Sequence, residues 1–240
     1  MKIKYATICE KGKRTNNEDK VKVIDMQDKN RWTAIVCDGL GGHSLGDVAS
    51  EIAINTISKY WVRNINVTDS KEKVVKACEE VSVSIDIKSS DLNHCEMGTT
   101  MAMISIENDI ATIAHIGDSR CYLIRKGHCN NGGNLINSEK DNIVYQTEDH
   151  HRPNCDILSR CFFSYKPEAA VPDVVQFKVK PDDRILVCTD GLYNSVWPHV
   201  IIGRMMDDKS AETILDTFAF LCEKFSNDNY SGIMAIVEEV

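Results

Sequence analysis

The sequence has no apolar run that approaches the roughly 18 residues needed to cross a membrane. Its N-terminus, MKIKYATICEKGKRTNNEDK, also lacks the apolar segment of a signal peptide. Basic residues are in deficit, because 28 Lys and Arg against 36 Asp and Glu leave a formal net charge of −8. Proteins that bind nucleic acid normally gather an excess of Lys and Arg on one face. We therefore expect neither a membrane nor a nucleic acid as a partner.

Paired cysteines are missing as well. The ten cysteines are scattered along the chain and form no C-x-x-C pair, which argues against a disulfide framework or a cysteine-based zinc site. Cys37 in IVCDG and Cys188 in LVCTDG stand inside apolar segments, where a cysteine acts as a small hydrophobic residue. Reduced thiols of this kind are typical of the cytoplasm, which is the location we expect.

What the sequence does contain is enough apolar material for one core. Its 240 residues are 42% hydrophobic and 27% charged, as in an ordinary globular domain. Since no linker, low-complexity tract or repeat divides the chain, residues 1–240 are expected to form a single domain. The Asn- and Gly-rich residues 127–142 are expected to form a mobile surface loop.

Short polar turns join consecutive apolar segments, and consecutive strands of this kind pair antiparallel. The expected pairs are 20–26 with 32–37, 100–106 with 111–116, and 174–179 with 184–188. Further strands are expected at 121–125 and 232–237.

Helical periodicity occurs between and after these strands. Apolar residues share one helical face over 48–61 and again over 74–85, where Asp69 and Glu72 have the spacing of a capping box. A third helix is expected at 211–225. Because such helices cover the outer faces of stacked sheets, the fold class is α+β.

Three aspartates follow apolar segments at distant positions: Asp38 in AIVCDG, Asp118 in IGDSR and Asp190 in LVCTDG. Taken singly, an Asp-Gly after a strand is usually a turn. Strands of this kind end at the rim of a core, however, and several carboxylates at one rim repel each other. At about 4 Å such a pair costs on the order of 4 kcal/mol at an effective dielectric constant near 20. Bound cations would cancel that repulsion.

The ligand types favour a hard cation. Carboxylates, the Gly39 carbonyl and water suit Mg²⁺ or Mn²⁺, and two such ions would activate a water molecule against a phosphate ester. Arg14 could grip the phosphate through two parallel hydrogen bonds, although its position fits a solvated surface arginine equally well. The positions of the histidines in the sequence do not support a metal cluster. These residues are His115, His128, His150, His151 and His199.

These motifs, taken in order, resemble those of the metal-dependent serine/threonine protein phosphatases of type 2C, the PPM family. The resemblance runs almost from end to end. Its elements are RTNNED (14–19), VCDGLGGHSLGDVAS (36–50), MGTT (97–100), AHIGDSR (114–120), QTEDH (146–150), LVCTDGL (186–192) and DN (228–229). Each motif alone is weak, but the set in this order is specific.

The resemblance implies a four-layer αββα sandwich, in which two antiparallel sheets lie between helix pairs and the metals occupy a channel at one sheet edge. It also implies that Asp38 bridges two Mn²⁺ or Mg²⁺ ions. The Gly39 carbonyl would bind one ion, and Asp190 and Asp228 the other.

The same resemblance implies roles for the remaining site residues. Glu18 and Asp19 would hold water molecules on the ions, and Arg14 would bind the substrate phosphate. Asp118 would form, with Asp190, the weaker third metal site of bacterial members. The expected catalytic residues are Arg14, Asp38 and Asp190.

The chain departs from the family pattern in two places. Leu40 stands where eukaryotic members carry a histidine that is a proposed proton donor to the leaving alcohol. His43 is close in sequence, but a structural role suits it better, and a water on a metal ion could donate instead. The flap segment of bacterial members is shortened here, since Asp149 and His150 run almost directly into 151–160.

The leading hypothesis is a phosphatase that hydrolyses phosphoserine and phosphothreonine by direct attack of metal-activated water. We expect it to be a monomer that acts on phosphorylated proteins, such as the substrates of a Ser/Thr kinase. One alternative is a catalytically degenerate relative that only binds phosphoproteins. Another is a phosphatase of small phosphomonoesters, since a shortened flap leaves the channel more open.

Overall fold

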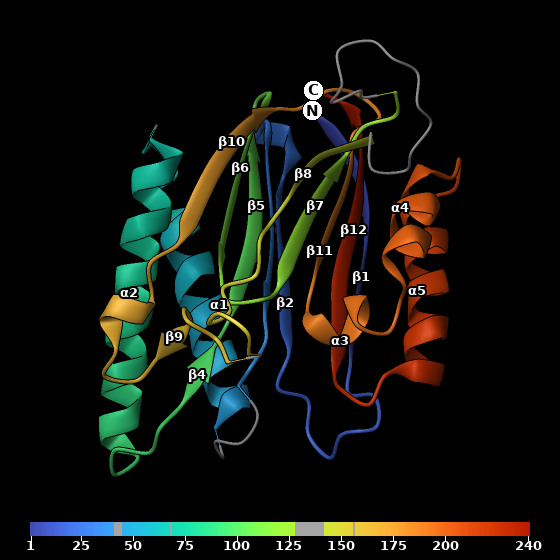
Figure 1. Cartoon of the computed structure of the whole chain (residues 1–240). Helices are drawn as coiled ribbons and strands as arrows, with labels where there is room; N and C mark the ends of the chain where they lie inside the picture. Colours follow the sequence, from blue (N-terminus) through green and yellow to red (C-terminus); the bar gives the residue numbers. More distant parts are fainter. Residues whose placement is uncertain (41–44, 68, 128–141, 156) are drawn as a thin grey trace.

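In the computed structural model of the chain, two five-stranded antiparallel sheets lie face to face between two layers of helices (Figure 1). The structure describes residues 1–40, 45–67, 69–127, 142–155 and 157–240. This arrangement confirms the expected αββα sandwich. Among the described residues, no helix combines the length and the apolar character needed to span a membrane.

Each sheet draws its strands from distant parts of the sequence. The first sheet has the order β1 (Lys2–Glu10), β12 (Tyr230–Glu239), β11 (Arg184–Cys188), β7 (Arg120–Ile124) and β8 (Ile143–Gln146). The second has the order β10 (Asp173–Lys178), β6 (Ile110–Ile116), β5 (Met101–Glu107), β3 (Arg31–Cys37) and β2 (Lys20–Met26). A short pair is formed by β4 (Gly98–Thr99) and β9 (Phe162–Phe163).

Helices cover the outer face of each sheet (Figure 1). The second sheet carries α1 (Gly46–Arg63) and α2 (Ser70–Asp91). The first carries the short α3 (Asp190–Tyr193), α4 (Pro198–Met206) and α5 (Ala211–Phe225). The predicted start of α2 is confirmed, because the Asp69 carboxylate accepts hydrogen bonds from the backbone N–H groups of Lys71 and Glu72. Single 3₁₀ turns occur at η1 (Gln27–Lys29) and η3 (Pro167–Ala169).

Strand β3 shows why the apolar segments are continuous instead of alternating. Ala34 and Val36 point into the core between the sheets, whereas Ile35 and Cys37 point into the core under α1 and α2. All four side chains are fully buried. A strand covered on both faces needs apolar residues at every position. The same reason applies to β11, whose alternate residues face the core between the sheets and the core under α5.

Most of the expected elements are confirmed. Strands β2 and β3 pair antiparallel, as do β5 and β6, and α5 has the bounds that its periodicity predicts. The described cysteines are all free thiols, as expected. His43 and residues 128–141 of the expected mobile loop lie outside the described residues.

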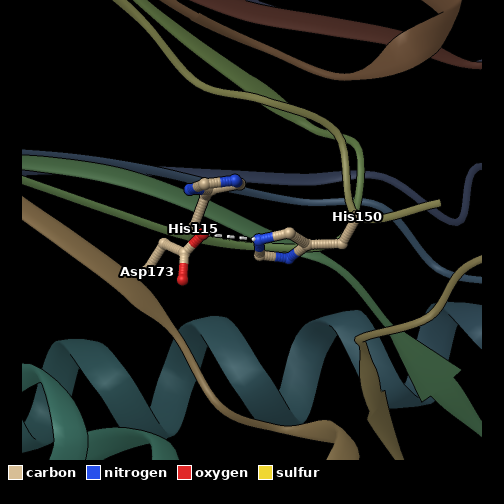
Figure 2. A group of neighbouring side chains, drawn as sticks. All are labelled: His115, His150 and Asp173. Atoms are coloured by element: carbon tan, nitrogen blue, oxygen red, sulfur yellow. Dashed lines mark hydrogen bonds and ion pairs between the residues drawn. The ribbon is translucent and has the colours of Figure 1, made fainter.

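The expected pairing of residues 174–179 with 184–188 is wrong. Strand β10 pairs with β6 in the second sheet, where Asp173 lies opposite His115 (Figure 2). Strand β11 pairs with β7 and β12 in the first sheet, so the turn between β10 and β11 crosses from one sheet to the other.

Arg125 fixes this crossing. Its guanidinium donates to both oxygens of the buried Asp183 carboxylate, at 2.6 and 2.8 Å, and to the Lys178 carbonyl at 3.0 Å. A paired, hydrogen-bonded carboxylate can be buried at a turn where an unpaired one could not. The side-chain contact therefore overrides the local preference of a short turn for a hairpin.

The core under α5 can be tested with two phenylalanines of that helix. Phe218 is fully buried, whereas Phe220 is 53% exposed. We expect Phe218→Ala to lower the free energy of unfolding by about 3–5 kcal/mol through lost burial and a residual cavity. Phe220→Ala, the matched control, should change it by no more than about 0.5 kcal/mol. Urea unfolding followed by circular dichroism measures both, and equal effects would mean that the helix packs on a different face.

Candidate metal centre

The acidic residues gather around one cavity. Helix α3, which begins with one of them, lies toward the end of the sandwich opposite the two chain termini (Figure 1). Asp38 directly follows β3, and Asp118 follows β6 after one glycine. Asp190 is the first residue of α3, after β11. These strands all reach the same end with their carboxyl termini, so the aspartates that follow them converge.

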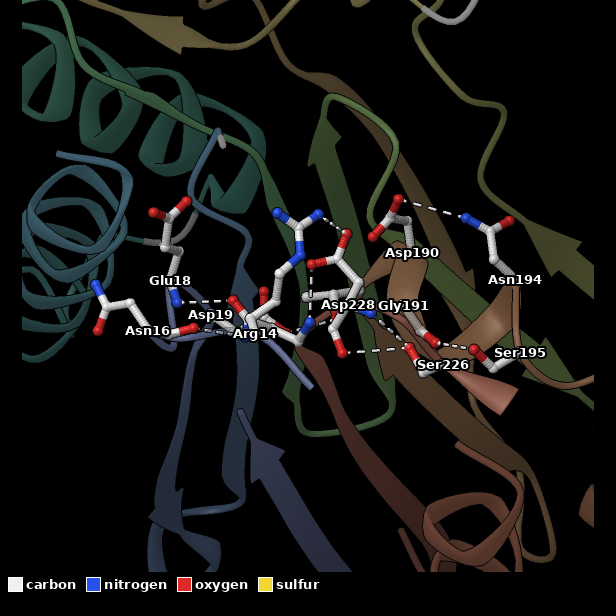
Figure 3. Close-up of polar contacts among 12 residues, drawn as sticks. Arg14, Asn16, Glu18, Asp19, Asp190, Gly191, Asn194, Ser195, Ser226 and Asp228 are labelled. Carbon is white, nitrogen blue, oxygen red and sulfur yellow. Dashed lines mark hydrogen bonds and ion pairs between the residues drawn. The ribbon is translucent and has the colours of Figure 1, made fainter. Parts of the chain in front are cut away.

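Two loops complete the site (Figure 3). The connection between β1 and β2 supplies Arg14, Glu18 and Asp19, and the connection between α5 and β12 supplies Asp228. These groups surround a cavity of about 460 Å³. Its lining is Arg14, Thr15, Asn16, Glu18, Asp38, Gly39, Leu40, Thr100, Asp118, Asp190, Asp228 and Asn229. Every residue predicted to act in catalysis, substrate binding or metal binding, except Asp19, is in this lining.

Burial and mutual repulsion raise the pKa values of two of the central carboxyl groups. The pKa of Asp38 is raised well above its usual value by burial and then by the charges of Asp19 and Asp190. Burial also raises the pKa of Asp190 to about 6, with Asp118 and Asp228 adding repulsion. A divalent cation would reverse this situation by stabilising the charged forms.

Asp19 lies behind the cavity and is 1% exposed. Its Oδ2 accepts a hydrogen bond of 2.8 Å from the Thr189 hydroxyl, but its buried Oδ1 has no partner among the described residues. Burial raises its pKa to about 7. This buried oxygen lies in a carboxylate near Asp190, Asp228 and the Ser231 hydroxyl, an environment that fits a hard divalent cation and its water molecules.

Arg14 makes an ion pair with a member of the acidic group. Its Nη2 donates to Asp228 Oδ2 at 2.7 Å, while Asp228 Oδ1 accepts from the Asn229 backbone N–H at 2.8 Å. The Arg14 side chain is 52% exposed, so its remaining donors can reach a ligand in the cavity. A guanidinium in this position suits a phosphate group.

Hydroxyl groups that the sequence analysis left without a role hold Asp38 in place. Thr99 Oγ1 donates to the Asp38 carbonyl at 2.8 Å. Thr100 Oγ1 accepts from the Asp38 N–H at 3.1 Å and lies 2.7 Å from Ser119 Oγ. The GTT and GDSR motifs signalled these residues, although only the structure shows that they meet.

Asn229 performs the same task for the loop that carries Glu18. Its Oδ1 accepts from the Glu18 N–H at 2.9 Å, and its Nδ2 donates to the carbonyls of Lys11 and Asn16 at 2.7 and 2.8 Å. A Cβ atom on Gly191 would lie 1.9 Å from the Asn229 carbonyl oxygen. The glycine after Asp190 is therefore required for the two loops to approach each other.

A second cavity of about 450 Å³ adjoins the first and shares Asp118 and Asp190 with it. His151, the residue after the DH pair, lies here with Nε2 at 3.3 Å from Asp118 Oδ2. The Tyr193 hydroxyl donates to the Asp118 carbonyl at 3.1 Å. The segment after the DH pair therefore brings an imidazole nitrogen next to Asp118, a contact that the sequence did not predict.

Comparisons with known proteins agree with this geometry. Residues 11–230 match the family model described as "Protein phosphatase 2C". The chain is 31% identical over 231 residues to the serine/threonine phosphatase stp of Listeria welshimeri, covering 93% of this chain and 90% of that protein.

Two solved structures share the fold. The serine/threonine phosphatase of S. agalactiae superposes with a TM-score of 0.81 at 20% identity, over 99% of this chain and 100% of that one. The catalytic domain of the serine/threonine protein phosphatase PstP, in complex with two manganese ions, gives a TM-score of 0.77 at 23% identity, over 99% of both chains.

The raised pKa values predict how stability depends on pH when metal is chelated. A carboxyl group whose pKa is higher in the folded state stabilises the fold fully below its unfolded pKa, and this contribution is lost as pH rises through the folded pKa. For Asp19 and Asp190 the window runs from about 4 to about 7. We expect the melting temperature in chelator to fall over this window, on the order of 5 °C.

The control for this effect is Asp190→Asn, which removes one of the two groups and should flatten the fall. Thermal melts of both proteins in EDTA, at pH values from 4.5 to 7.5, make the comparison. A melting temperature that rises with pH in the parent protein would contradict the raised pKa values.

Proposed function

The chain belongs to the protein phosphatase 2C family, and from this premise we propose that it hydrolyses phosphoserine and phosphothreonine in proteins with the help of Mn²⁺ or Mg²⁺ held at the acidic cavity. The match over residues 11–230 also supports treating residues 1–240 as one catalytic domain. We further propose that it acts as a monomer, because one chain supplies every side chain that the proposed reaction uses and a second copy need contribute none.

The proposed ligands are the oxygens that face one another in the cavity. Asp38 lines the cavity and would help to hold both ions, with the Gly39 carbonyl on one and Asp190 and Asp228 on the other. Glu18 and Asp19 would accept hydrogen bonds from water on the ions. The buried and unpartnered Oδ1 of Asp19 supports this role.

When bound, two such ions lower the pKa of a shared water molecule and clamp the phosphoryl group. The chain itself binds and orients the ester. The Arg14 guanidinium, directed by Asp228, would hold two phosphate oxygens. Leu40 lines the cavity and has no proton to give, so the leaving alcohol takes its proton from water within the cavity.

The observation that carries the proposal is the close approach of Asp38 and Asp190. Burial and like charge raise the pKa of each of these carboxyl groups, and they lie at the ends of strands from different sheets. A fold that only recognised a phosphate dianion would gain nothing from carboxylates in its binding cavity, because they repel the ligand. Cation-assisted hydrolysis accounts for the carboxylates, because they would bind the cations.

A weaker third ion is proposed between Asp118 and Asp190 in the second cavity. Its lining also offers the Asp149 carboxylate, but Arg120 occupies this group with hydrogen bonds of 2.8 and 2.7 Å. Asp118 is contacted by His151. Because Asp118 and Asp149 already have hydrogen-bond partners, this site would bind a cation more weakly than the first cavity.

We predict that hydrolysis of a phosphothreonine peptide requires added Mn²⁺ or Mg²⁺ and stops in EDTA. Asp38→Asn should lower kcat by more than about a hundredfold, because it removes the bridging charge at constant volume. Mn²⁺ at a hundred times its dissociation constant should stabilise the parent protein by about 2.7 kcal/mol. The variant should show a much smaller rise in melting temperature.

Asp109→Asn is the matched control, since Asp109 lies in the turn between β5 and β6 and pairs with Lys178. Turnover of the peptide should be unaffected in this variant. Comparison with p-nitrophenyl phosphate separates a protein phosphatase from an enzyme for small phosphomonoesters. Stabilisation by Mn²⁺ without turnover of either substrate would favour a phosphoprotein-binding module.

For Arg14→Ala we predict a rise in KM for the phosphopeptide of roughly tenfold or more, because a charged hydrogen-bond donor to phosphate is lost. Arg14→Lys should recover only part of this affinity, since an ammonium group cannot make two parallel bonds. Lys13→Ala serves as the control. An unchanged KM with a lowered melting temperature would show that Arg14 acts only through Asp228.

A further inference from the structure

Two histidines and an aspartate form a cluster outside the acidic cavity (Figure 2). His115 lies on β6 opposite Asp173 of β10, and His150 comes from the segment after β8. One ligand atom from each residue lies within 4.8 Å of the other two. This spacing admits a metal ion. The positions of the hydrogen atoms on the two rings distinguish a metal site from a hydrogen-bonded lock.

The contacts of His150 determine its tautomer. Its Nδ1 accepts a hydrogen bond of 3.1 Å from the Gly117 backbone N–H, so this nitrogen carries a lone pair. The hydrogen of the neutral ring is then on Nε2, which lies 3.0 Å from Asp173 Oδ2 and donates to it. Arg160 Nη1 lies farther from Nε2, at 3.4 Å, and donates at 2.6 Å to the other oxygen of Asp173. Both ring nitrogens are therefore already used.

A metal ion on His150 would break this arrangement. It would replace the Nε2 hydrogen and move it to Nδ1, where it would face the N–H of Gly117. His115 Nε2 donates to the Glu148 carbonyl at 2.8 Å, so its Nδ1 carries a lone pair, which has no partner among the described residues. The two rings are stacked, however, with centroids 4.3 Å apart and planes inclined by 22°. Their in-plane lone pairs run side by side and do not converge on one ion.

What His150 holds is the turn that carries Asp118. Its backbone N–H donates to the Gly117 carbonyl at 3.0 Å, so ring and backbone together fix both polar groups of this glycine. Gly117 has φ +102°, and a Cβ there would lie 2.7 Å from Thr100 Cγ2. The turn is strained for any other residue and needs fixed partners.

The position of Gly117 affects two residues of the acidic cavity. Asp118, the next residue, lines both cavities. Ser119 follows, and its hydroxyl contacts Thr100 Oγ1, which accepts from the Asp38 N–H. Displacement of Gly117 would therefore disturb Asp118 directly and Asp38 through the two hydroxyl groups.

We propose that His150 is a positioning residue for the phosphatase site, and that Asp173 keeps its imidazole in the Nε2–H tautomer that accepts the Gly117 N–H. The proposal rests on the proposed function only in that Asp118 and Asp38 serve catalysis. Arg160 completes the lock, since its Nη1 donates to Asp173 Oδ1 at 2.6 Å and leaves Oδ2 for His150.

Three substitutions test this lock. His150→Asn places an amide oxygen near the position of Nδ1 and keeps an acceptor for Gly117, whereas His150→Phe keeps a ring and loses the acceptor. Asp173→Asn should behave like His150→Phe. In this variant Arg160 would bind the amide oxygen, so the amide NH₂ would face His150 Nε2. Because NH₂ donates a hydrogen bond, it would favour the tautomer with hydrogen on Nδ1, which cannot accept from the Gly117 N–H. His199→Phe is the control, because His199 lies on α4.

The readouts are Mn²⁺ affinity by calorimetry, kcat on a phosphopeptide, and the ¹⁵N shifts of the His150 ring in the parent protein. We expect His150→Phe and Asp173→Asn each to lose about tenfold in kcat and in Mn²⁺ affinity, the effect of roughly one hydrogen bond to a buried group. His150→Asn should stay within about threefold of the parent. The ¹⁵N shifts should show a protonated Nε2 and a bare Nδ1.

Distinct results overturn the proposal. A protonated Nδ1 in the parent protein would do so without any variant, even if all of the variants failed to fold. Parent-like Mn²⁺ affinity and turnover in His150→Phe would also do so, as would His150→Asn being as impaired as His150→Phe. If the parent binds Mn²⁺ and shows the expected tautomer and variant pattern but hydrolyses no phosphopeptide, the proposed function fails and the positioning role stands.

Discussion

Repulsion between Asp38, Asp190 and their acidic neighbours is the constraint on which this end of the molecule depends. A pair of like charges about 4 Å apart costs on the order of 4 kcal/mol at an effective dielectric constant near 20, so ionising all of these groups without a counter-charge would cost a large part of the stability of an ordinary domain. Burial, and then repulsion from neighbouring carboxylates, raises the pKa values of Asp19, Asp38 and Asp190. The site is thus built to accept positive charge.

In this fold, uncharged groups hold the acidic residues in position, and neutralisation of their charge is left to bound cations. Thr99 and Thr100 hold the backbone of Asp38, Thr189 binds the Asp19 carboxylate, and Asn229 fixes Glu18. All four are uncharged hydrogen-bonding groups, so they fix positions and leave the negative charge almost intact for cations. The proposed lock at His150 follows the same rule, because a neutral imidazole holds the turn before Asp118.

How far the sequence could predict this structure depends on whether the information is local. Strand β3 and helix α5 are predictable because burial on both faces or on one face leaves a pattern in consecutive residues. The crossing between β10 and β11 is not, since it depends on Arg125, the residue after β7, reaching Asp183 far along the sequence. The acidic residues themselves could be named from their motifs, but the tautomer of His150 depends on Asp173 and Gly117, which no sequence spacing connects.

This division also explains why the site is spread over short, widely separated motifs. Each acidic group arrives at the end of a buried strand or in a loop, and it needs a neutral anchor on a neighbouring segment to resist its neighbours. Gly191 allows the backbone of Asn229 to approach to a distance that no side chain would permit, and this approach brings Asp228 beside Asp190. Arg14 then adds one guanidinium that pairs with Asp228 at the exposed rim, where solvent weakens the pair. A phosphate dianion can compete for such an exposed guanidinium, whereas a fully buried ion pair would have withheld it.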